Sequence, residues 1–287
     1  MSDFAKLRET IAKQFETQVE NMRTVTHYTS LEGLCSIIQN HQLWASNVRF
    51  LNDEQELKYG VDTAISFLEE EVYAADDPAS NFLSTHIDRL RDSLLNSSLP
   101  PIYACCFCET RDNLSLWRGY SKGGQPIAID FNVGLLQQHL NAKIVPVSYG
   151  QGDTRKALQR AYAQWRTEFE GLAAQDAANL ESHLEALRNV VFTLAPQFKH
   201  QGFAGEQEWR LIVERPSGDQ IQYRTRDYVI VPYVAIGTKD VPLPIDTIRI
   251  GPGKNMELTK SSVEMLLQSN PEYAEIEVEL SNVPFRT

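Results

Sequence analysis

The sequence predicts an α+β fold, in which a core of antiparallel strands is accompanied by helices, and three observations lead to it. Segments with helical spacing of apolar residues gather early and in the middle of the chain, whereas β-rich segments gather toward its end. The regular alternation of strand and helix that builds a parallel sheet is not followed. The 287 residues are 42% hydrophobic and 23% charged, an ordinary globular balance for a chain long enough to bury a sizeable core.

Helices are predicted where apolar residues recur every three or four positions. Thr29 and Glu32 have the spacing of a capping box, so a helix is expected to begin at Thr29. Asn52, Asp53 and Glu54 are expected to cap a later helix that runs to Tyr73. The predicted helices cover residues 2–21, 29–38, 52–73, 78–96, 113–120, 152–195 (a pair with a break near 171–176) and 256–267.

Strands are predicted where short runs are rich in β-branched and apolar residues. They cover residues 24–28, 43–45, 102–108, 126–131, 143–149, 206–214, 227–234, 245–250 and 275–278. No linker forces a domain boundary, so a single domain over 1–287 is expected, with helical insertions at about 53–97 and 152–195.

Composition narrows the classes of function. The net charge of −11 weakens any case for broad binding of a nucleic-acid backbone, which needs an excess of Lys and Arg. No apolar run is long enough to cross a membrane, and the first residues do not resemble a signal peptide, so a cytoplasmic protein is expected. Three of the four cysteines lie in the run 102–108, where they fit a buried strand better than a metal site.

Two polar blocks lie at predicted junctions between elements. His27 and Tyr28 end the first predicted strand, where an imidazole can transfer a proton and a phenol offers a stacking surface. The simpler alternative is a core tyrosine beside a surface histidine. In the second block, Asn52 and Asp53 either line a pocket or only cap the following helix.

A third block, residues 116–124, combines an aromatic, a guanidinium, a hydroxyl and a glycine turn. Arg118 could bind phosphate in a bidentate manner, and Trp117 or Tyr120 could stack on a base. The spacing matches neither a P-loop nor a dinucleotide-binding fingerprint. A purely structural turn is the alternative.

The fourth block is the run Glu206-Gln207-Glu208-Trp209-Arg210. In a strand, alternate residues share a face, so Glu206, Glu208 and Arg210 are expected on one side. Paired carboxylates can divide acid and base roles, because each raises the pKa of the other. The alternative is a solvent-facing strand with a ladder of charges.

The order of these blocks resembles a bacterial family known as domain of unknown function 2971. The matching residues run from about 24 to 255 and consist of His27-Tyr28-Thr29, Asn52-Asp53-Glu54-Gln55-Glu56, Trp117-Arg118-Gly119-Tyr120-Ser121, the stretch from Lys199 through Phe203 to Glu206-Gln207-Glu208-Trp209-Arg210, and Gly251-Pro252. The glutamate block is the most specific of these matches.

More loosely, the blocks resemble the triad of ADP-ribosyltransferases, which hold NAD in a cleft between two small antiparallel sheets. The resemblance implies such a split antiparallel core after an N-terminal helical region. It also implies that His27 binds a ribose hydroxyl, that Tyr28 or Tyr120 stacks on nicotinamide, and that Arg118 contacts the pyrophosphate.

The remaining roles come from the same resemblance. Ser121 would brace the glutamate, and Glu208 would hydrogen-bond the nicotinamide ribose. The expected catalytic residues are Glu208, Glu206 and His27. The expected NAD-binding residues are His27, Tyr28, Thr29, Asn52, Arg118, Tyr120, Ser121 and Arg210. Because the chain combines the His-Tyr start of one branch with the Glu-x-Glu end of another, the catalytic glutamate stays open.

The expected function is therefore NAD-dependent ADP-ribosyl transfer or NAD hydrolysis, of the kind found in bacterial toxins and phage-defence effectors. The acceptor, which could be a protein, a nucleic acid, a small molecule or water, and the oligomeric state stay open. One alternative is a metal-dependent nuclease or phosphoesterase that uses Asp53, Glu206 and Glu208 as oxygen ligands. Another is a non-catalytic nucleotide sensor.

Overall fold

The computed structural model describes residues 24–51, 55–73, 77–96, 101–120, 124–172, 180–214, 216–226 and 228–284. These residues divide into two compact units. The helical unit contains residues 48–102 and 147–203, and the sheet unit contains the described residues before 48, from 103 to 146, and from 204 onward. Both helical insertions expected from the sequence lie in the helical unit; the single domain stays a prediction.

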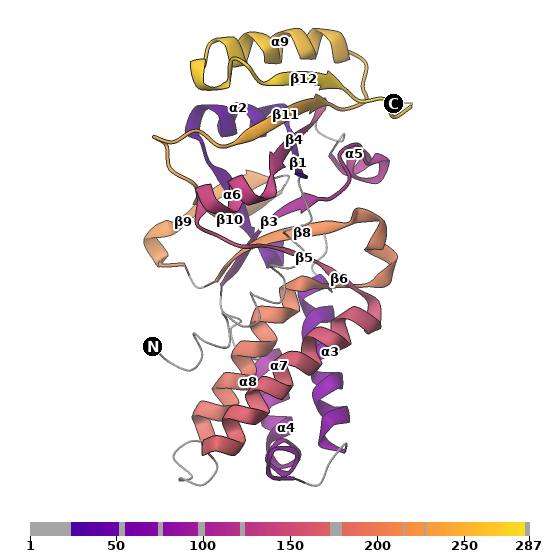
Figure 1. Cartoon of the computed structure of the whole chain (residues 1–287), viewed down its shortest axis with the longest axis vertical. Coiled ribbons are helices and arrows are strands. Elements are labelled where there is room, and N and C mark those ends of the chain that lie inside the picture. Colours follow the sequence, from indigo (N-terminus) through magenta and orange to yellow (C-terminus); the bar gives the residue numbers. More distant parts are fainter. Residues whose placement is uncertain are drawn as a thin grey trace. The chain divides into compact units, whose positions relative to one another are not determined.

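The sheet unit is built on one mostly antiparallel sheet, so the predicted α+β class is confirmed (Figure 1). Its order is β12-β11-β4-β1-β3-β2-β10-β9, with β8 paired to β3 and β5. Every neighbouring pair in that order is antiparallel except β11 and β12, which run parallel. The strands are β1 Thr24–Ser30, β2 Leu43–Asn47, β3 Ile102–Cys108, β4 Pro126–Asn132, β5 Ile144–Pro146, β8 Glu208–Glu214, β9 Ile221–Arg226, β10 Val229–Ile236, β11 Ile245–Ile250 and β12 Glu277–Leu280.

Alternation along the strands separates an apolar face from a more polar one. Val25 of β1 and Ile127, Ile129 and Phe131 of β4 belong to the main core, together with apolar residues of three helices. These helices are α2 Leu31–Asn40, α6 Val133–Leu140 and α9 Met256–Gln268. On β4, the intervening Ala128 packs instead in a smaller cluster with Trp117 of α5 Leu114–Tyr120.

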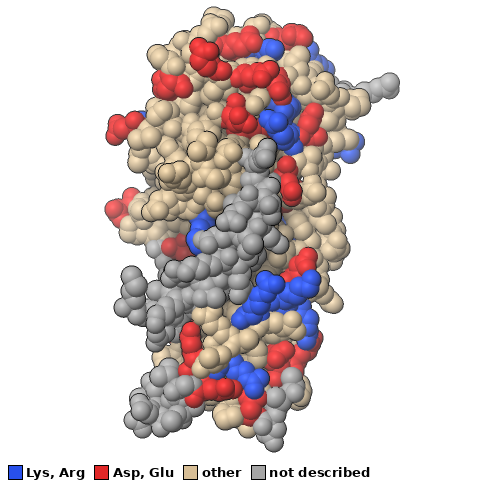
Figure 2. All heavy atoms as spheres, viewed as in Figure 1, with Lys and Arg blue, Asp and Glu red and all other residues tan. Residues whose placement is uncertain are grey.

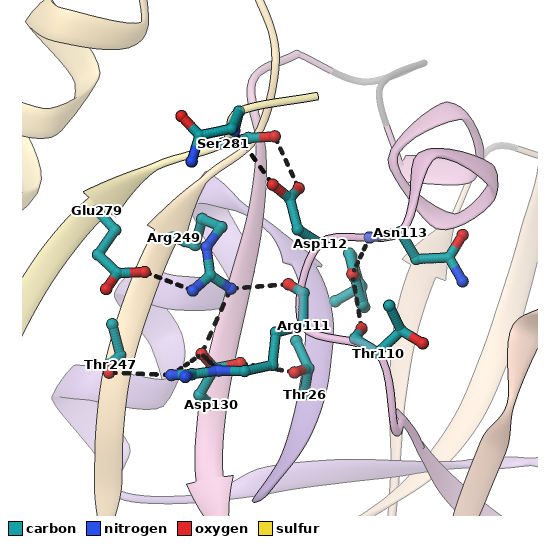
Figure 3. A network of polar contacts seen from close by, with 12 residues as sticks. Thr26, Thr110, Arg111, Asp112, Asn113, Asp130, Thr247, Arg249, Glu279 and Ser281 are labelled. Atoms are coloured by element: carbon teal, nitrogen blue, oxygen red, sulfur yellow. Dashed lines mark hydrogen bonds and ion pairs between the residues drawn. The ribbon is translucent and has the colours of Figure 1, made fainter. Parts of the chain in front are cut away.

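A fully buried carboxylate, Asp130, organises the centre of the polar face (Figure 3). It accepts hydrogen bonds from the Thr26 hydroxyl at 2.6 Å and from Arg111 Nε at 2.8 Å. Arg249 Nη1 lies 3.4 Å from the same carboxylate and donates to the main-chain oxygen of Arg111 at 2.7 Å. Arg249 also pairs with Glu279 of β12. The network therefore ties β1, β4, β11 and β12 to the loop that follows β3.

The next residue of that loop, Asp112, fixes α5 and the last described segment. Its carboxylate accepts hydrogen bonds from Trp117 Nε1 at 2.5 Å, the Ser281 hydroxyl at 2.7 Å and the Asn282 amide at 3.1 Å. Gly251 follows β11 where a Cβ atom would lie 2.6 Å from the Trp117 ring. Only glycine leaves room for the indole at this point.

The helical unit is a bundle with an aromatic interior (Figure 1). Its helices are α3 Gln55–Val72, α4 Pro78–Asn96, α7 Gly150–Leu172 and α8 Leu180–Leu194. Phe82 of α4 contacts Trp165 and Phe169 of α7 and His183 of α8, with ring centroids 4.9–6.0 Å apart. A two-stranded parallel sheet of β6 Ser148–Tyr149 and β7 Phe198–Lys199 completes the described part of the unit.

Most predicted elements are confirmed, but several boundaries are wrong. The N-cap of α2 is Ser30, whose hydroxyl accepts from the Gly33 amide, so β1 extends through Ser30 and the predicted capping box of Thr29 and Glu32 is absent. The strand predicted at 143–149 is divided between β5 and β6, which belong to different sheets. Helix α6 and strand β9 were not predicted. The predicted helix at 2–21 and the cap at 52–54 lie outside the described residues.

Acidic and basic side chains are interspersed on the face seen in Figure 2. The net charge of −11 is therefore not expressed there as one continuous acidic surface. No helix among the described residues is long and apolar enough to cross a bilayer.

The Asp130 network generates a stability prediction. We expect Asp130→Asn to lower the free energy of unfolding by about 3–5 kcal/mol, because it leaves the buried Arg249 guanidinium without its buried counter-charge. Glu279→Gln is the matched control, since it removes a partner of the same arginine that is 37% exposed; we expect a loss below about 1 kcal/mol. Urea unfolding followed by circular dichroism measures both, and equal losses would contradict the assigned role of Asp130.

Candidate functional site

The most enclosed ion pair of the glutamate block is formed by Glu208 and Arg210 at the start of β8. Both side chains are buried, with 7% and 2% of their surface exposed. Arg210 Nε donates to Glu208 Oε1 at 2.8 Å and Nη2 donates to Oε2 at 2.9 Å. A bidentate pair of this kind fixes the carboxylate in one orientation. The prediction that these two residues share a face of the strand is confirmed.

Glu206 does not share that face, and this part of the prediction is wrong. It ends a 3₁₀ helix, Gln201–Glu206, and Gln207 then adopts a left-handed conformation with φ of 44°. The strand begins only at Glu208. Because the turn rotates the chain, the alternation that would place both carboxylates on one side does not reach back to Glu206. Its main-chain oxygen instead accepts from the Cys108 thiol at 3.0 Å.

Cys106 of β3 links Glu208 to His27 of β1. The Glu208 carboxylate hydrogen-bonds the Cys106 thiol, and burial followed by the negative charge of Glu208 raises the pKa of that thiol well above its ordinary value. The thiol is therefore protonated and donates to the carboxylate. The main-chain oxygen of the same residue lies 2.9 Å from His27 Nδ1. The imidazole and Glu208 therefore contact different atoms of one residue, its main-chain oxygen and its thiol.

These contacts define the protonation state of His27. Burial, the largest cause, and the positive charge of Arg224 lower its pKa, although the hydrogen bond to Cys106 opposes them. The imidazole is therefore neutral at pH 7. A carbonyl oxygen only accepts, so Nδ1 carries the proton and Nε2 is left as a hydrogen-bond acceptor.

Tyr28 points away from His27, as expected for adjacent residues of a strand. Its ring makes an edge contact with Trp117 at 4.8 Å, while His27 lies against Phe107 at 5.7 Å. The Tyr28 hydroxyl donates to the main-chain oxygen of Thr110 at 3.2 Å and accepts from the Asn113 amide at 2.9 Å. Tyr28 therefore anchors α5 to the sheet, and only 3% of it is exposed for contact with a ligand.

Tyr120, the last residue of α5, is 37% exposed and so offers an accessible aromatic surface. Its ring lies 6.2 Å from that of Tyr28. Burial of its hydroxyl end raises its pKa although the residue as a whole is partly exposed, and the acidic groups Cys106 and Glu208 act in the same direction. The hydroxyl is therefore neutral and close enough to Glu208 for the two to interact electrostatically. We call His27, Cys106, Tyr120, Glu208 and Arg210 the Glu208 cluster.

The other predicted residues are less central. The Thr29 hydroxyl lies so close to Gly33 that a Cβ atom there would collide with it, so Thr29 packs against the first turn of α2. Arg118 is exposed on α5. Asn52, Asp53 and Ser121 lie outside the described residues.

A pocket of about 550 Å³ lies apart from the Glu208 cluster, beside the Asp130 network. Its lining includes Arg111, Arg249 and Lys260, but also Asp112, Glu277 and Glu279. Both arginines already pair with Asp130, and Arg249 also pairs with Glu279. This pocket is therefore charge-balanced by structural ion pairs, and we place the candidate site at the Glu208 cluster, which also contains the sequence-predicted residues.

Within the described part of the chain, no group of three or more His, Cys, Asp or Glu residues is placed to hold a metal ion. Glu208, one of the ligands considered for a metal, has both carboxylate oxygens bound to Arg210. A metal at Glu208 would have to displace this guanidinium.

Sequence reasoning missed Arg224 and Arg226 because β9 was not predicted. The run Ile221–Arg226 alternates polar and apolar residues only weakly. Its pairing with β10 along six residue pairs supplies the order that the local sequence does not show.

The His27 environment predicts a pH dependence of stability. Unfolded His27 takes up a proton near its ordinary pKa of about 6.5, whereas the folded imidazole resists protonation. We therefore expect the free energy of unfolding to fall as the pH drops below 6.5, with a slope of at most about 1.4 kcal/mol per pH unit from this residue. His27→Gln should reduce the slope in urea titrations at pH 5–7. An unchanged slope would show that the folded imidazole titrates normally.

Comparison with known proteins adds one match. No curated protein and no solved structure matches the chain. A family model described as "Protein of unknown function (DUF2971)" matches residues 116–211, about a third of the chain. This segment begins in α5 and ends in β8, so it includes both Tyr120 and the Glu208–Arg210 pair. Over these residues the chain is similar to the family of unknown function represented by DUF2971.

Proposed function

We propose that the chain cleaves the bond between nicotinamide and ribose in NAD, by ADP-ribosyl transfer or by hydrolysis. The observation that carries the proposal is the fixed, buried carboxylate of Glu208, which binds the Cys106 thiol and acts on the accessible Tyr120, while the neutral His27 imidazole binds the main-chain oxygen of the same cysteine. The segment similar to the DUF2971 family contains Glu208 and Tyr120. A role as a bacterial toxin or phage-defence effector is a further part of this proposal.

The proposed chemistry needs a carboxylate at a defined position. Loss of nicotinamide leaves positive charge on the ribose, as in glycoside hydrolysis. Glu208 would stabilise that charge, and Arg210 would hold the carboxylate in place through its two hydrogen bonds. Because the pair is already formed without a ligand, little reorganisation is needed when the bond breaks.

His27 and Tyr120 are proposed to orient the substrate. The neutral His27 imidazole presents Nε2 as an acceptor, which suits a ribose hydroxyl. The exposed ring of Tyr120 offers a stacking surface for nicotinamide. Tyr28, whose hydroxyl and ring are occupied by α5 and its preceding loop, is assigned a structural role.

Incubation with NAD, followed by chromatography of free nicotinamide, tests the proposal. Release by the protein above the buffer rate supports it. If NAD raises the melting temperature but is not consumed, the sensor alternative holds. Phosphodiesterase activity that a chelator removes and NAD does not affect would favour the metal-dependent alternative. In either case the proposal fails.

Glu208→Gln should lower the rate of nicotinamide release by about 10²–10³. Glu214→Gln removes the same charge from the other end of β8 and is expected to retain activity. Because Glu208→Gln leaves Arg210 buried without a counter-charge, its folding has to be checked by circular dichroism. The double variant Glu208→Gln/Arg210→Gln removes both charges and should be equally inactive. Near-normal turnover in either folded variant would remove Glu208 from the mechanism.

A further inference from the structure

The side chain of Arg224 on β9 is a half-buried cation whose described contacts include no carboxylate. Its Nη2 atom donates to the Ser46 hydroxyl at 2.9 Å. Its Nε atom is buried and has no hydrogen-bond partner among the described residues. A buried guanidinium normally pairs with a carboxylate or donates all of its hydrogen bonds. Arg224 therefore retains an unused donor.

The surroundings of Arg224 are aromatic or cationic. Its guanidinium carbon lies 5.1 Å from the centroid of Trp44 and 6.0 Å from that of Tyr233. These two rings lie 4.7 Å from each other and form one continuous platform. Attraction between a cation and aromatic faces offsets part of the desolvation of the guanidinium. It does not neutralise the charge.

The groups with the largest effect on the pKa of Arg224, among the described residues, include no carboxylate. Arg226 lies two residues along the same strand, so both arginines project from the same face. Burial first, and then the charge of Arg226, lower the pKa of Arg224. His27, Tyr120 and Cys105 also interact electrostatically with Arg224, and burial lowers the pKa of the imidazole and raises those of the phenol and the thiol, so these three groups are neutral at pH 7.

Strand register places Arg224 on the same face as Cys106 of the Glu208 cluster, whereas His27 projects from the opposite face of β1, because its neighbour Thr26 pairs with Cys108. Ser46, which accepts the Arg224 hydrogen bond, pairs with Tyr233 of β10 and with Ala104 of β3. Directly paired residues share a face, and Cys106 lies two residues beyond Ala104 on that face. Arg224 thus shares a face with Cys106, and it is close enough to Tyr120 and His27 to affect their electrostatics.

We propose that Arg224, supported by Arg226, binds the phosphate groups of a nucleotide ligand. The anion-binding role rests on the unpaired donor, the clustering of two arginines and the aromatic platform. That the anion belongs to a nucleotide rests on the proposed function. A phosphate oxygen can accept from the unused Nε and from Nη, the bidentate geometry that guanidinium groups favour. The Ser46 hydroxyl, which accepts from Arg224, keeps its own proton for the same anion.

Arg224 takes the phosphate-binding role that the resemblance to ADP-ribosyltransferases implies for Arg118. Arg118 is on the exposed surface of α5, where water competes for each hydrogen bond. Arg224 is half-buried, so its interaction with an anion is less weakened by water than that of an exposed arginine.

Calorimetric titration of the full chain with pyrophosphate, ADP, inorganic phosphate and adenosine tests the proposal without requiring catalysis. Pyrophosphate and ADP are expected to bind. The Kd for adenosine, which has no phosphate, is expected to be at least tenfold higher. Arg224→Gln should raise the Kd for pyrophosphate and ADP about ten- to hundredfold, and Arg224→Lys less. Arg89→Gln, which removes the same charge from an exposed position of α4, should bind as the wild type does.

Melting temperatures separate ligand binding from a structural role. Because the change leaves no described carboxylate unpaired and removes a buried donor without a partner, Arg224→Gln is expected to melt close to the wild type without ligand. Pyrophosphate should raise the melting temperature of the wild type and of Arg89→Gln but not of Arg224→Gln. A large loss of ligand-free stability together with unchanged Kd values would overturn the proposal.

The two proposals fail in different ways. Pyrophosphate binding that depends on Arg224, without nicotinamide release from NAD, would retain the anion site and reject the cleavage reaction. Binding of inorganic phosphate as tight as that of ADP would retain the anion site and reject a nucleotide as its ligand. Nicotinamide release whose KM for NAD is the same in Arg224→Gln and in wild type would reject the anion site alone.

Discussion

Burial of the Asp130 carboxylate between Arg111 and Arg249 is the interaction on which the arrangement of the sheet unit depends. A carboxylate without exposed surface is tolerated only when it is paired and hydrogen-bonded, so β1, β4 and β11 must keep the register that supplies its partners. The same pairing fixes the loop that holds Asp112, and Asp112 anchors the indole of Trp117. The position of α5, and with it that of Tyr120, therefore depends on the ion pairs that Asp130 of β4 forms with the loop after β3.

Adjacent residues of β1 serve different purposes because a strand directs them to opposite sides. Tyr28 uses its ring and hydroxyl to hold α5, whereas His27 reaches across to the main chain of β3. The gap between the two strands makes this possible, since β1 and β3 share a register pair only at Thr26 and Cys108. An imidazole can thus take the place of missing main-chain hydrogen bonds and still present one nitrogen for chemistry.

The boundaries of helices and strands could be predicted from the sequence where local propensity and tertiary packing favour the same structure. The apolar strands at 102–108 and 245–250 and the periodic helix at 256–267 are found within a residue of their predicted ends, because burial and propensity favour the same structure there. The prediction failed at Glu206, where one left-handed residue, Gln207, interrupts the alternation. It also missed β9, whose exposed residues are ordered by pairing with β10, and therefore missed Arg224. Tertiary pairing at an edge strand leaves little trace in local composition.

The arginines of the site differ in whether a carboxylate neutralises their charge. Arg210 is neutralised by Glu208, so this pair contributes orientation and little net charge. Arg224 adds positive charge on the face that it shares with Cys106, next to Tyr120, whose hydroxyl is neutral at pH 7. The chain as a whole carries a net charge of −11, which repels anions. A local excess of positive charge therefore attracts anions to this face in particular. A dinucleotide would use both features of the site. Its phosphates would bind the Arg224 guanidinium, and its reacting sugar would lie against the fixed carboxylate of Glu208.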